Sequence, residues 1–379
     1  MVASPETTAA GAPTAWTHTG YAQQIVFGTG SVGRLGELLR GLGARRALLV
    51  TTTGRHDSAD GATVRDALGR NLISTFAEVT SHVPAPLVQA AMLQARRDGV
   101  DAVVSFGGGS CADLAKAVCF FTEQEAGTPG ASYADRPALP HVAVPTTYSG
   151  AELTPFFGMT DPTTRQKSGG GGPTIAPMAA VYDPELTLST PARVSAETGM
   201  NALAHCVEAA WSPSRTPEAE AIALAGARRI YAALPEVVAD PAAVDGRARM
   251  LQGAVLGGRC LQNGSMGVHH GLSQLVGGRT GISHGLANAM ILPHAIRFNA
   301  DAVPAVVAAL ASAMGVDDLA GAIADLVVRV GLPAGLGECG VTEDDLDAVA
   351  RLSQSNPNVL ANPAAVSEAD ARAILASAY

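Results

Sequence analysis

The feature that most constrains the fold is a change of sequence pattern near residue 185. Before that point, short apolar runs alternate with stretches that have helical apolar spacing. Four runs are typical of strands and four stretches are typical of helices: 24–28, 46–51, 102–106 and 141–145, and 31–43, 61–70, 86–98 and 110–124. Such alternation predicts βαβ units built around a buried parallel sheet.

After Asp183-Pro184 the strand signal ends. Apolar residues then recur with a spacing near 3.6, and Ser367 with Asp370 is typical of the start of a last helix. The predicted helices are 215–233, 245–262, 286–299, 303–314 and 317–330. We therefore predict a disordered arm over residues 1–19, an α/β nucleotide-binding domain over 20–185 and an all-α substrate and catalytic domain over 186–379.

Composition excludes several classes of partner. The formal charge is −9, and no cluster of Lys and Arg is present, so we expect neither nucleic acid nor an anionic membrane as a partner. No apolar stretch approaches the roughly 20 residues of a membrane span, and the first 16 residues lack a secretion signal. The five cysteines form no CxxC pair, which favours reduced thiols and a cytoplasmic location.

A glycine-rich loop follows the third predicted strand. Gly107, Gly108 and Gly109 let the backbone approach a phosphate closely, and Ser110 and Asp113 lie at the start of the helix that follows. The loop is not GxGxxG, so the ordinary dinucleotide fingerprint does not apply. Cys111 stands where a helix dipole can lower a thiol pKa, but we expect it to be a small space-filling residue.

A second loop, 145–152, follows the next predicted strand. Its hydroxyls, among them those of Thr146 and Thr147, can line the other side of a cofactor site. Ligands of parallel α/β sheets lie at the carboxyl ends of the strands, where both loops are expected. Thr52 follows an earlier strand, at the position where a carboxylate often binds the cofactor ribose. With no carboxylate there, we expect NADPH to be tolerated alongside NADH, and strict NADH preference would contradict this.

The helical half carries a group of histidines. Asn201 and His205 are four residues apart on one predicted helix, and His269, His270 and His284 follow later. Asn201, His205, His270 and His284 could hold zinc or iron, although a neutral amide compensates the charge of a divalent ion less than a carboxylate does. Equally, the imidazoles could form a metal-free pocket that polarises a carbonyl and delivers a proton.

These motifs resemble the iron-type, group III alcohol dehydrogenases, whose fold is that of dehydroquinate synthase. Within that group the chain looks most similar to the maleylacetate reductases. The stretches that carry this resemblance are Gly107–Lys116, Pro145–Pro155, Val181–Leu188, Gly199–Ala209 and His269-His270, with the tail around Asn356-Pro357 and Ser367–Tyr379.

The resemblance implies a homodimeric reductase that uses NADH or NADPH to convert maleylacetate, a carboxylated enone, to 3-oxoadipate. Asn201 replaces the Asp of the metal-dependent members, so a metal-free reaction is implied. The resemblance places Gly107, Gly108, Gly109 and Ser110 at the cofactor pyrophosphate and Thr146 and Thr147 beside the cofactor, and His205, His270 and His284 keep the family's histidine positions. To the cofactor set we add Thr52, Asp113 and Lys167, and we expect Arg165 and Lys167 to lie in a polar loop that holds a phosphate or carboxylate. The catalytic candidates are His205, His269, His270 and His284.

Two departures from the family pattern keep other functions open. Gln274 stands where the family usually has a histidine, and segment 283–289 is closer to general alcohol dehydrogenases. One alternative is therefore a metal-dependent alcohol or aldehyde dehydrogenase. Another is a non-redox lyase, dehydratase or cyclase, and the last is a cofactor-binding protein without catalysis.

Overall fold

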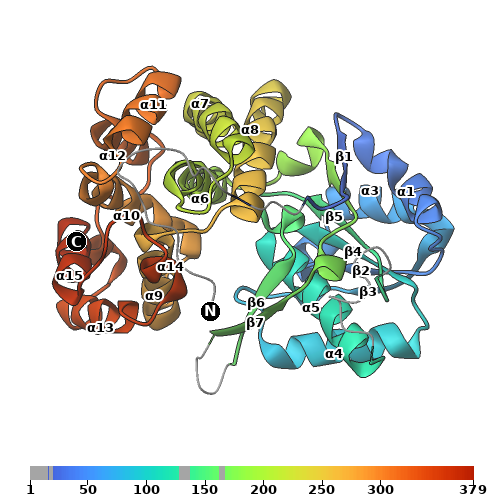
Figure 1. Ribbon diagram of the computed structural model, residues 1–379. Coiled ribbons are helices and arrows are strands. Elements are labelled where there is room, and N and C mark those ends of the chain that lie inside the picture. The colour runs from blue at the N-terminus through green and yellow to red at the C-terminus, as the bar shows by residue number, and fades with distance from the viewer. Residues whose placement is uncertain (1–15, 17–19, 128–136, 162–166) are drawn as a thin grey trace.

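The computed structural model describes residue 16 and residues 20–127, 137–161 and 167–379. The predicted arm, residues 1–19, lies outside this description except for Trp16. Figure 1 shows the α/β half and the helical half side by side. The last strand of the sheet ends at Tyr182 and the first long helix begins at Ala192, so we propose the domain boundary near residue 185.

The α/β half is built on six parallel strands in the order β1-β8-β5-β4-β2-β3. Their bounds are β1 Gln24–Phe27, β2 Ala47–Val50, β3 Leu72–Phe76, β4 Ala102–Gly107, β5 His141–Pro145 and β8 Ala179–Tyr182. The four predicted strands are confirmed. The sequence did not reveal β3, an edge strand that contains Ser74 and Thr75, or β8, which is short and begins with two alanines.

Helices cover both faces of this sheet (Figure 1). On one face α1 (Leu35–Gly41) and α3 (Ala59–Leu68) pack on the strands, and on the other α4 (Ala85–Arg97) and α5 (Gly109–Glu125) do so. The predicted helix at 31–43 begins as a 3₁₀ turn, η1 (Ser31–Arg34). β2 and β4 are buried at every residue, which agrees with the continuous apolar runs that predicted them.

A small hairpin follows the second loop. It joins β6 (Phe156–Thr160) to β7 (Lys167–Gly171) in an antiparallel pair, and Lys167 lies opposite Thr160. The prediction of a polar loop at Lys167 is therefore wrong, because its backbone is part of this ladder. Arg165 lies outside the described residues.

The second half is helical throughout. Its elements are α6 Ala192–Trp211, α7 Pro217–Ala239, α8 Val244–Asn263, α9 Val268–Thr280, α10 His284–Asn299, α11 Pro304–Met314, α12 Leu319–Arg329, α13 Glu343–Ser353, α14 Pro357–Leu360 and α15 Glu368–Ser377. The predicted capping pair of Ser367 and Asp370 is confirmed. Helix α6 is buried along its whole second half, so it forms the centre of this domain and carries the predicted residues Asn201 and His205 inward.

Small residues allow the close packing around α6. A Cβ on Gly199 would lie 2.4 Å from Leu234 Cδ1, and one on Gly257 would lie 2.8 Å from the Ala202 carbonyl oxygen.

Across the described ranges, no single helix is long and apolar enough to cross a membrane. The bent pair α11 and α12 passes that test by length and composition, and Leu310 and Ile323 of this pair are buried in the helical core.

Candidate active site

The glycine-rich loop is shaped as a phosphate site. Gly107 ends β4 with φ 145°, and a Cβ there would lie 2.6 Å from Cys111 Sγ, so only glycine fits. Helix α5 begins directly after Gly108, which caps it without a side-chain hydrogen bond. The first backbone N–H groups of α5 therefore have no side-chain acceptor at the cap, and a helix start of this kind can bind an anion.

The second loop lies against the first because β5 is the neighbour of β4. The Thr146 N–H donates to the Gly107 carbonyl at 2.9 Å, and a Cβ on Gly108 would lie 3.2 Å from Thr147 Cγ2. The hydroxyl oxygens of Thr146 and Thr147 are buried and have no hydrogen-bond partner. Unpartnered hydroxyls beside a glycine loop fit a phosphate-bearing nicotinamide cofactor, because its oxygens would satisfy them.

Asp113 and Thr52 make protein contacts of their own. The Asp113 carboxylate lies 2.9 Å from Lys116 Nζ, and the buried Lys116 also donates to the Ala151 carbonyl at 2.9 Å. The Thr52 hydroxyl accepts from the Arg55 N–H at 3.2 Å and caps α2 (Thr53–His56). The cofactor roles predicted for Asp113 and Thr52 therefore remain proposals.

The expectation that no carboxylate lies near Thr52 is wrong. The chain after β3 pairs Glu78 with Thr52 in an antiparallel bridge, so an exposed carboxylate-bearing residue does lie at this strand end. The sequence did not reveal it because Glu78 is 26 residues away along the chain. A carboxylate at this place can bind ribose hydroxyls and repel a 2′-phosphate.

The predicted histidines are brought together by three helices. The rings of His205 from α6 and His270 from α9 stack with centroids 4.8 Å apart. The His284 ring, at the start of α10, lies 5.8 Å from that of His270, and the His269 ring lies 4.9 Å from it. His205 Nδ1 and His270 Nε2 are buried and have no hydrogen-bond partner. A Cβ on Gly150 would lie 3.7 Å from His205 Nδ1, so this nitrogen lies close to the second loop.

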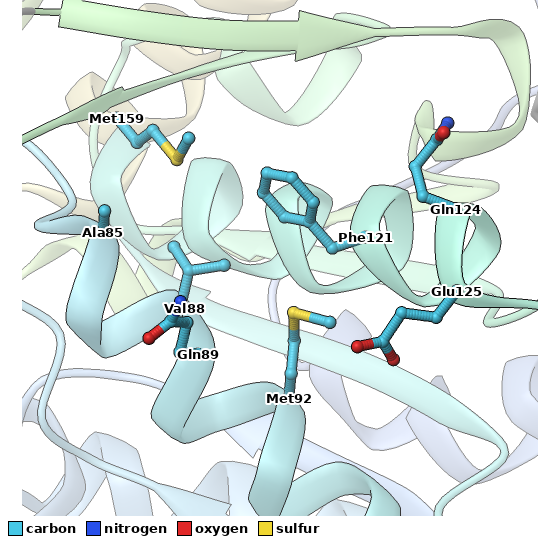
Figure 2. A pocket seen from close by; sticks show the side chains of 8 residues that line it. All are labelled: Ala85, Val88, Gln89, Met92, Phe121, Gln124, Glu125 and Met159. Carbon is cyan, nitrogen blue, oxygen red and sulfur yellow. The ribbon is translucent and has the colours of Figure 1, made fainter.

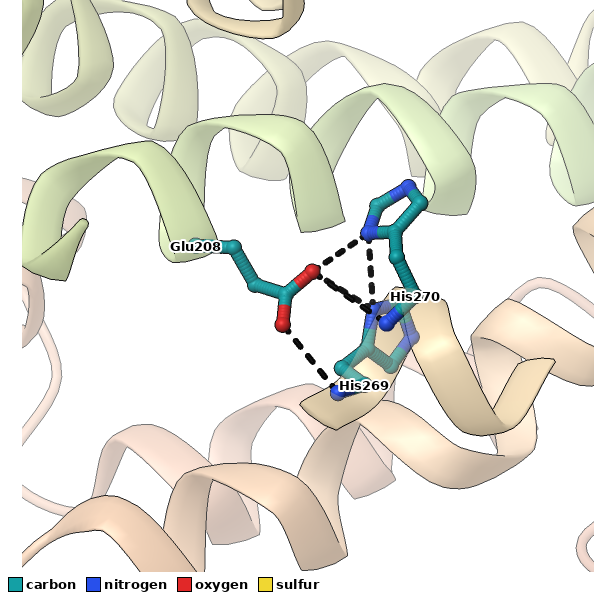
Figure 3. Close-up of side chains that lie close together, drawn as sticks. All are labelled: Glu208, His269 and His270. Carbon is teal, nitrogen blue, oxygen red and sulfur yellow. Dashed lines mark hydrogen bonds and ion pairs between the residues drawn. The ribbon is translucent and has the colours of Figure 1, made fainter. Parts of the chain in front are cut away.

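Glu208 organises this histidine group, and sequence reasoning missed it (Figure 3). Its Oε1 accepts from the Gly267 and His269 N–H groups at 3.0 and 3.1 Å. Its Oε2 accepts from the His270 N–H at 3.2 Å and lies 2.5 Å from His270 Nδ1. The only signal was its place three residues after His205, on the same face of α6.

Burial and hydrogen bonding set the charges here. Burial alone would raise the pKa of Glu208, but the bonds from His269 and His270 outweigh it and hold the pKa below its ordinary value. Burial lowers the pKa of His270, against the opposing effect of Glu208. Burial, with the charges of His270 and His284, lowers the pKa of His205 well below its usual range.

Comparison with known proteins decides the family. A model described as "Iron-containing alcohol dehydrogenase" matches residues 22–184, and one described as "Fe-containing alcohol dehydrogenase family, C-terminal" matches residues 195–379. The chain belongs to the iron-containing alcohol dehydrogenase family. It is therefore an NAD(P)-dependent oxidoreductase with the dehydroquinate synthase-like fold of that family, as the sequence predicted.

Relatives in this family include named reductases. The maleylacetate reductase of Burkholderia cepacia is 35% identical over 94% of this chain and 95% of its own. The maleylacetate reductase structure from Agrobacterium tumefaciens is 33% identical, with a TM-score of 0.86, over 97% of this chain and 99% of its own. A sulfoacetaldehyde reductase from Bifidobacterium kashiwanohense, solved in complex with NAD+, is 26% identical, with a TM-score of 0.86, over 97% and 99% of the two chains.

The family name implies a metal. The atoms that could bind it are those of Asn201, the site histidines and Glu208. His205 Nδ1 and His270 Nε2 lack partners, but Asn201 supplies only a neutral amide oxygen, which also accepts from Asn288 Nδ2 at 2.6 Å. Within the described ranges, the one acid–histidine group close enough to hold a metal is Glu208, His269 and His270. Both Glu208 oxygens already accept two bonds each. A neutral donor set without a free carboxylate does not fit a divalent metal well.

Two further residues of the sequence analysis are placed by the structure. Cys111 is buried, and burial raises the pKa of its thiol to about 12, so its predicted space-filling role is confirmed. Gln274 lies one turn after His270 on α9, and its Oε1 accepts from Asn358 Nδ2 at 3.2 Å. Its amide is therefore oriented by α14.

Two pockets are found in the described structure, and neither is lined by a histidine of the site. One, of about 240 Å³, lies between α4 and α5 with Val88, Met92 and Phe121 in its wall (Figure 2). The other, of about 390 Å³, is lined by Glu197 and Ser283 among others. Glu197 and Ser283 are close in sequence to Asn201 and His284, but none of the site histidines lines this pocket.

Proposed function

We propose that this enzyme reduces the carbon–carbon double bond of maleylacetate and forms 3-oxoadipate, with NADH or NADPH as reductant. The observation that carries the proposal is the pair of buried, unpartnered nitrogens, His205 Nδ1 and His270 Nε2, the first of which lies close to the loop after β5. Relatives that match nearly the whole chain are maleylacetate reductases, which supports the substrate. We also expect a cytoplasmic homodimer.

When bound, the nicotinamide cofactor would supply the hydride, which would add to the alkene carbon that is β to the ketone. Negative charge then develops on the ketone oxygen, and the neighbouring α carbon must take up a proton from the protein or solvent. One hydride and one proton are added, so the alkene becomes a saturated bond and NAD(P)+ is formed. An enolate of this kind is stabilised by hydrogen-bond donors aimed at its oxygen.

The chain has residues for each task. Gly107–Ser110, with the Thr146 and Thr147 hydroxyls, would hold the cofactor phosphates. His205 would donate from its unpartnered Nδ1 to the enolate oxygen, and His270 Nε2, once it has taken up a proton from solvent, would deliver that proton to the α carbon. Glu208 holds His270 through Nδ1, so that Nε2 remains available. His269 bonds the Asn288 carbonyl at 2.9 Å and supports its neighbour. Lys167 is proposed to hold a cofactor phosphate or a carboxylate.

Substrate-dependent oxidation of the cofactor tests this proposal. Purified enzyme should oxidise NADH when maleylacetate is added and should form 3-oxoadipate in equal amount. Turnover of simple alcohols or aldehydes, with none of maleylacetate, would instead favour a general alcohol dehydrogenase. A change in maleylacetate without any oxidation of NADH or NADPH would favour a non-redox enzyme.

We propose that the reaction needs no metal, because Asn201 Oδ1 already accepts from Asn288 and neither Glu208 oxygen is free. Prolonged dialysis against a chelator should leave kcat within about twofold of its starting value, since no charge-compensated metal site is lost. Elemental analysis should find far less than one metal ion per chain. Loss of activity on chelation, restored by iron or zinc, would contradict this prediction.

Glu78 is expected to favour NADH over NADPH. Its carboxylate would lie near a 2′-phosphate bound at Thr52, and like charges near a protein surface repel by about 1 kcal/mol or more. Glu78→Gln should therefore lower the Kd of NADPH about fivefold relative to that of NADH. Glu37→Gln, which removes an exposed carboxylate on α1, is the matched control. An unchanged ratio of the two Kd values would exclude a role for Glu78.

A further inference from the structure

Arg247 of α8 is a buried cation without a carboxylate partner. Its side chain is fully buried, and among the described residues no carboxylate forms an ion pair with it. The guanidinium instead donates to four neutral oxygens. They are Ser195 Oγ at 2.6 Å, the Thr190 carbonyl at 2.9 Å, the Pro241 carbonyl at 3.0 Å and Tyr148 Oη at 3.3 Å. Burying a charge is costly, and an apolar residue could fill the same space, so these directed bonds need an explanation.

The acceptors place Arg247 next to the loop after β5 (residues 145–152), the cofactor loop. Tyr148 belongs to the loop after β5, and its own side chain is fully buried. Thr190 belongs to the segment that enters α6, and its hydroxyl donates to the Thr146 carbonyl at 2.8 Å. Arg247 therefore holds the loop at two points, at Tyr148 directly and at Thr146 through Thr190. Thr146 is one of these points and Thr147 lies between them, and the hydroxyls of both have no protein partner.

Arg55 contacts the same threonine from the α/β half. Its Nη2 donates to Thr190 Oγ1 at 2.6 Å, and its Nη1 donates to Ser189 Oγ. Burial lowers the pKa of the Arg55 guanidinium; nearby Asp60 opposes this, and the charge of Arg247 adds to the lowering. Thr190 thus receives a guanidinium from each half of the chain. The hydrogen bonds of Thr190 fix the position of the cofactor loop relative to α6, which carries His205.

We infer that Arg247 is a positioning residue for cofactor binding, which acts by holding Thr146 and Thr147 in place through Thr190 and Tyr148. This inference rests on the nicotinamide cofactor of the proposed function but not on its substrate. Arg247 itself does not touch the cofactor, because it is fully buried. Its removal should therefore weaken cofactor binding more than it slows the step that follows.

Titration of NADH without substrate, followed by fluorescence, is the direct test. Arg247→Lys keeps the charge but cannot reach all four acceptors, so the Kd of NADH should rise about tenfold. Tyr148→Phe removes one acceptor and should raise the Kd about threefold, with little change in Tm. In steady state, both variants should raise KM for NADH more than they lower kcat at saturating NADH. Arg249→Met, two residues away at an exposed position, is the matched control and should bind NADH as the wild type does.

The outcomes separate positioning from simple packing. A lower Tm for Arg247→Lys with an NADH Kd within twofold of wild type would show that Arg247 only stabilises the fold. If Arg247→Lys does not fold, an unchanged Kd for Tyr148→Phe would overturn the inference by itself. Wild-type enzyme that binds NADH but does not reduce maleylacetate would contradict the proposed substrate and leave this inference standing.

Discussion

Replacing His270 by alanine is expected to lower kcat by about a hundredfold or more, the usual contribution of a positioned acid–base group. His270 Nε2 is buried and unpartnered, while Nδ1 is held by Glu208, so the substitution removes a positioned proton-exchange group from the site. The glycine loop lies between β4 and α5, away from α9, so the Kd of NADH should stay within about twofold of wild type. Steady-state kinetics with maleylacetate and a separate NADH titration measure the two effects.

The control for this variant is His294→Ala on α10. His294 is half-buried, and no role in the site is assigned to it, so its removal should leave kcat close to that of wild type. If His270→Ala retains the wild-type kcat, His270 takes no part in the reaction. If His270→Ala loses NADH binding as well, the substitution changes the structure of the site rather than the chemical step.

The sequence predicted features that depend on neighbours along the chain. The loops that follow β4 and β5 could be assigned to one edge of the sheet because both strands read as buried and parallel. Asn201 and His205 could be placed together because four residues make one helical turn. The gathering of His205, His270 and His284 was expected from the family resemblance, and the ring distances agree with it.

Contacts between distant segments could not be predicted in the same way. Glu208 accepts from backbone N–H groups about 60 residues later, and backbone groups leave no signature in side-chain spacing. Glu78 reaches Thr52 only because β3 lies beside β2. Arg247 looks like any other charged residue of a helix until its four acceptors are known. These residues all act through the tertiary arrangement of segments whose sequences are ordinary.

Among the substitutions proposed for this enzyme, Glu208→Ala is expected to lower the free energy of unfolding most. Three backbone N–H groups and His270 Nδ1 would lose their acceptor in a fully buried place. Each buried donor left unsatisfied costs about 1–3 kcal/mol, so the free energy of unfolding should fall by about 4 kcal/mol or more. Urea unfolding followed by circular dichroism measures this loss. Glu236→Gln, at an exposed position on α7, is a control that should change the unfolding free energy by less than about 0.5 kcal/mol.

Glu208→Gln separates this structural role from the effect on His270. The glutamine oxygen can still accept from Gly267 and His269, so the protein should remain folded. Its amide group is a donor and cannot accept the Nδ1–H of His270, so the imidazole must change tautomer or lose the bond. The kcat should then fall about tenfold or more, as expected when the orienting partner of a catalytic histidine is lost. A folded variant with wild-type kcat would show that Glu208 only caps the start of α9 and does not orient His270.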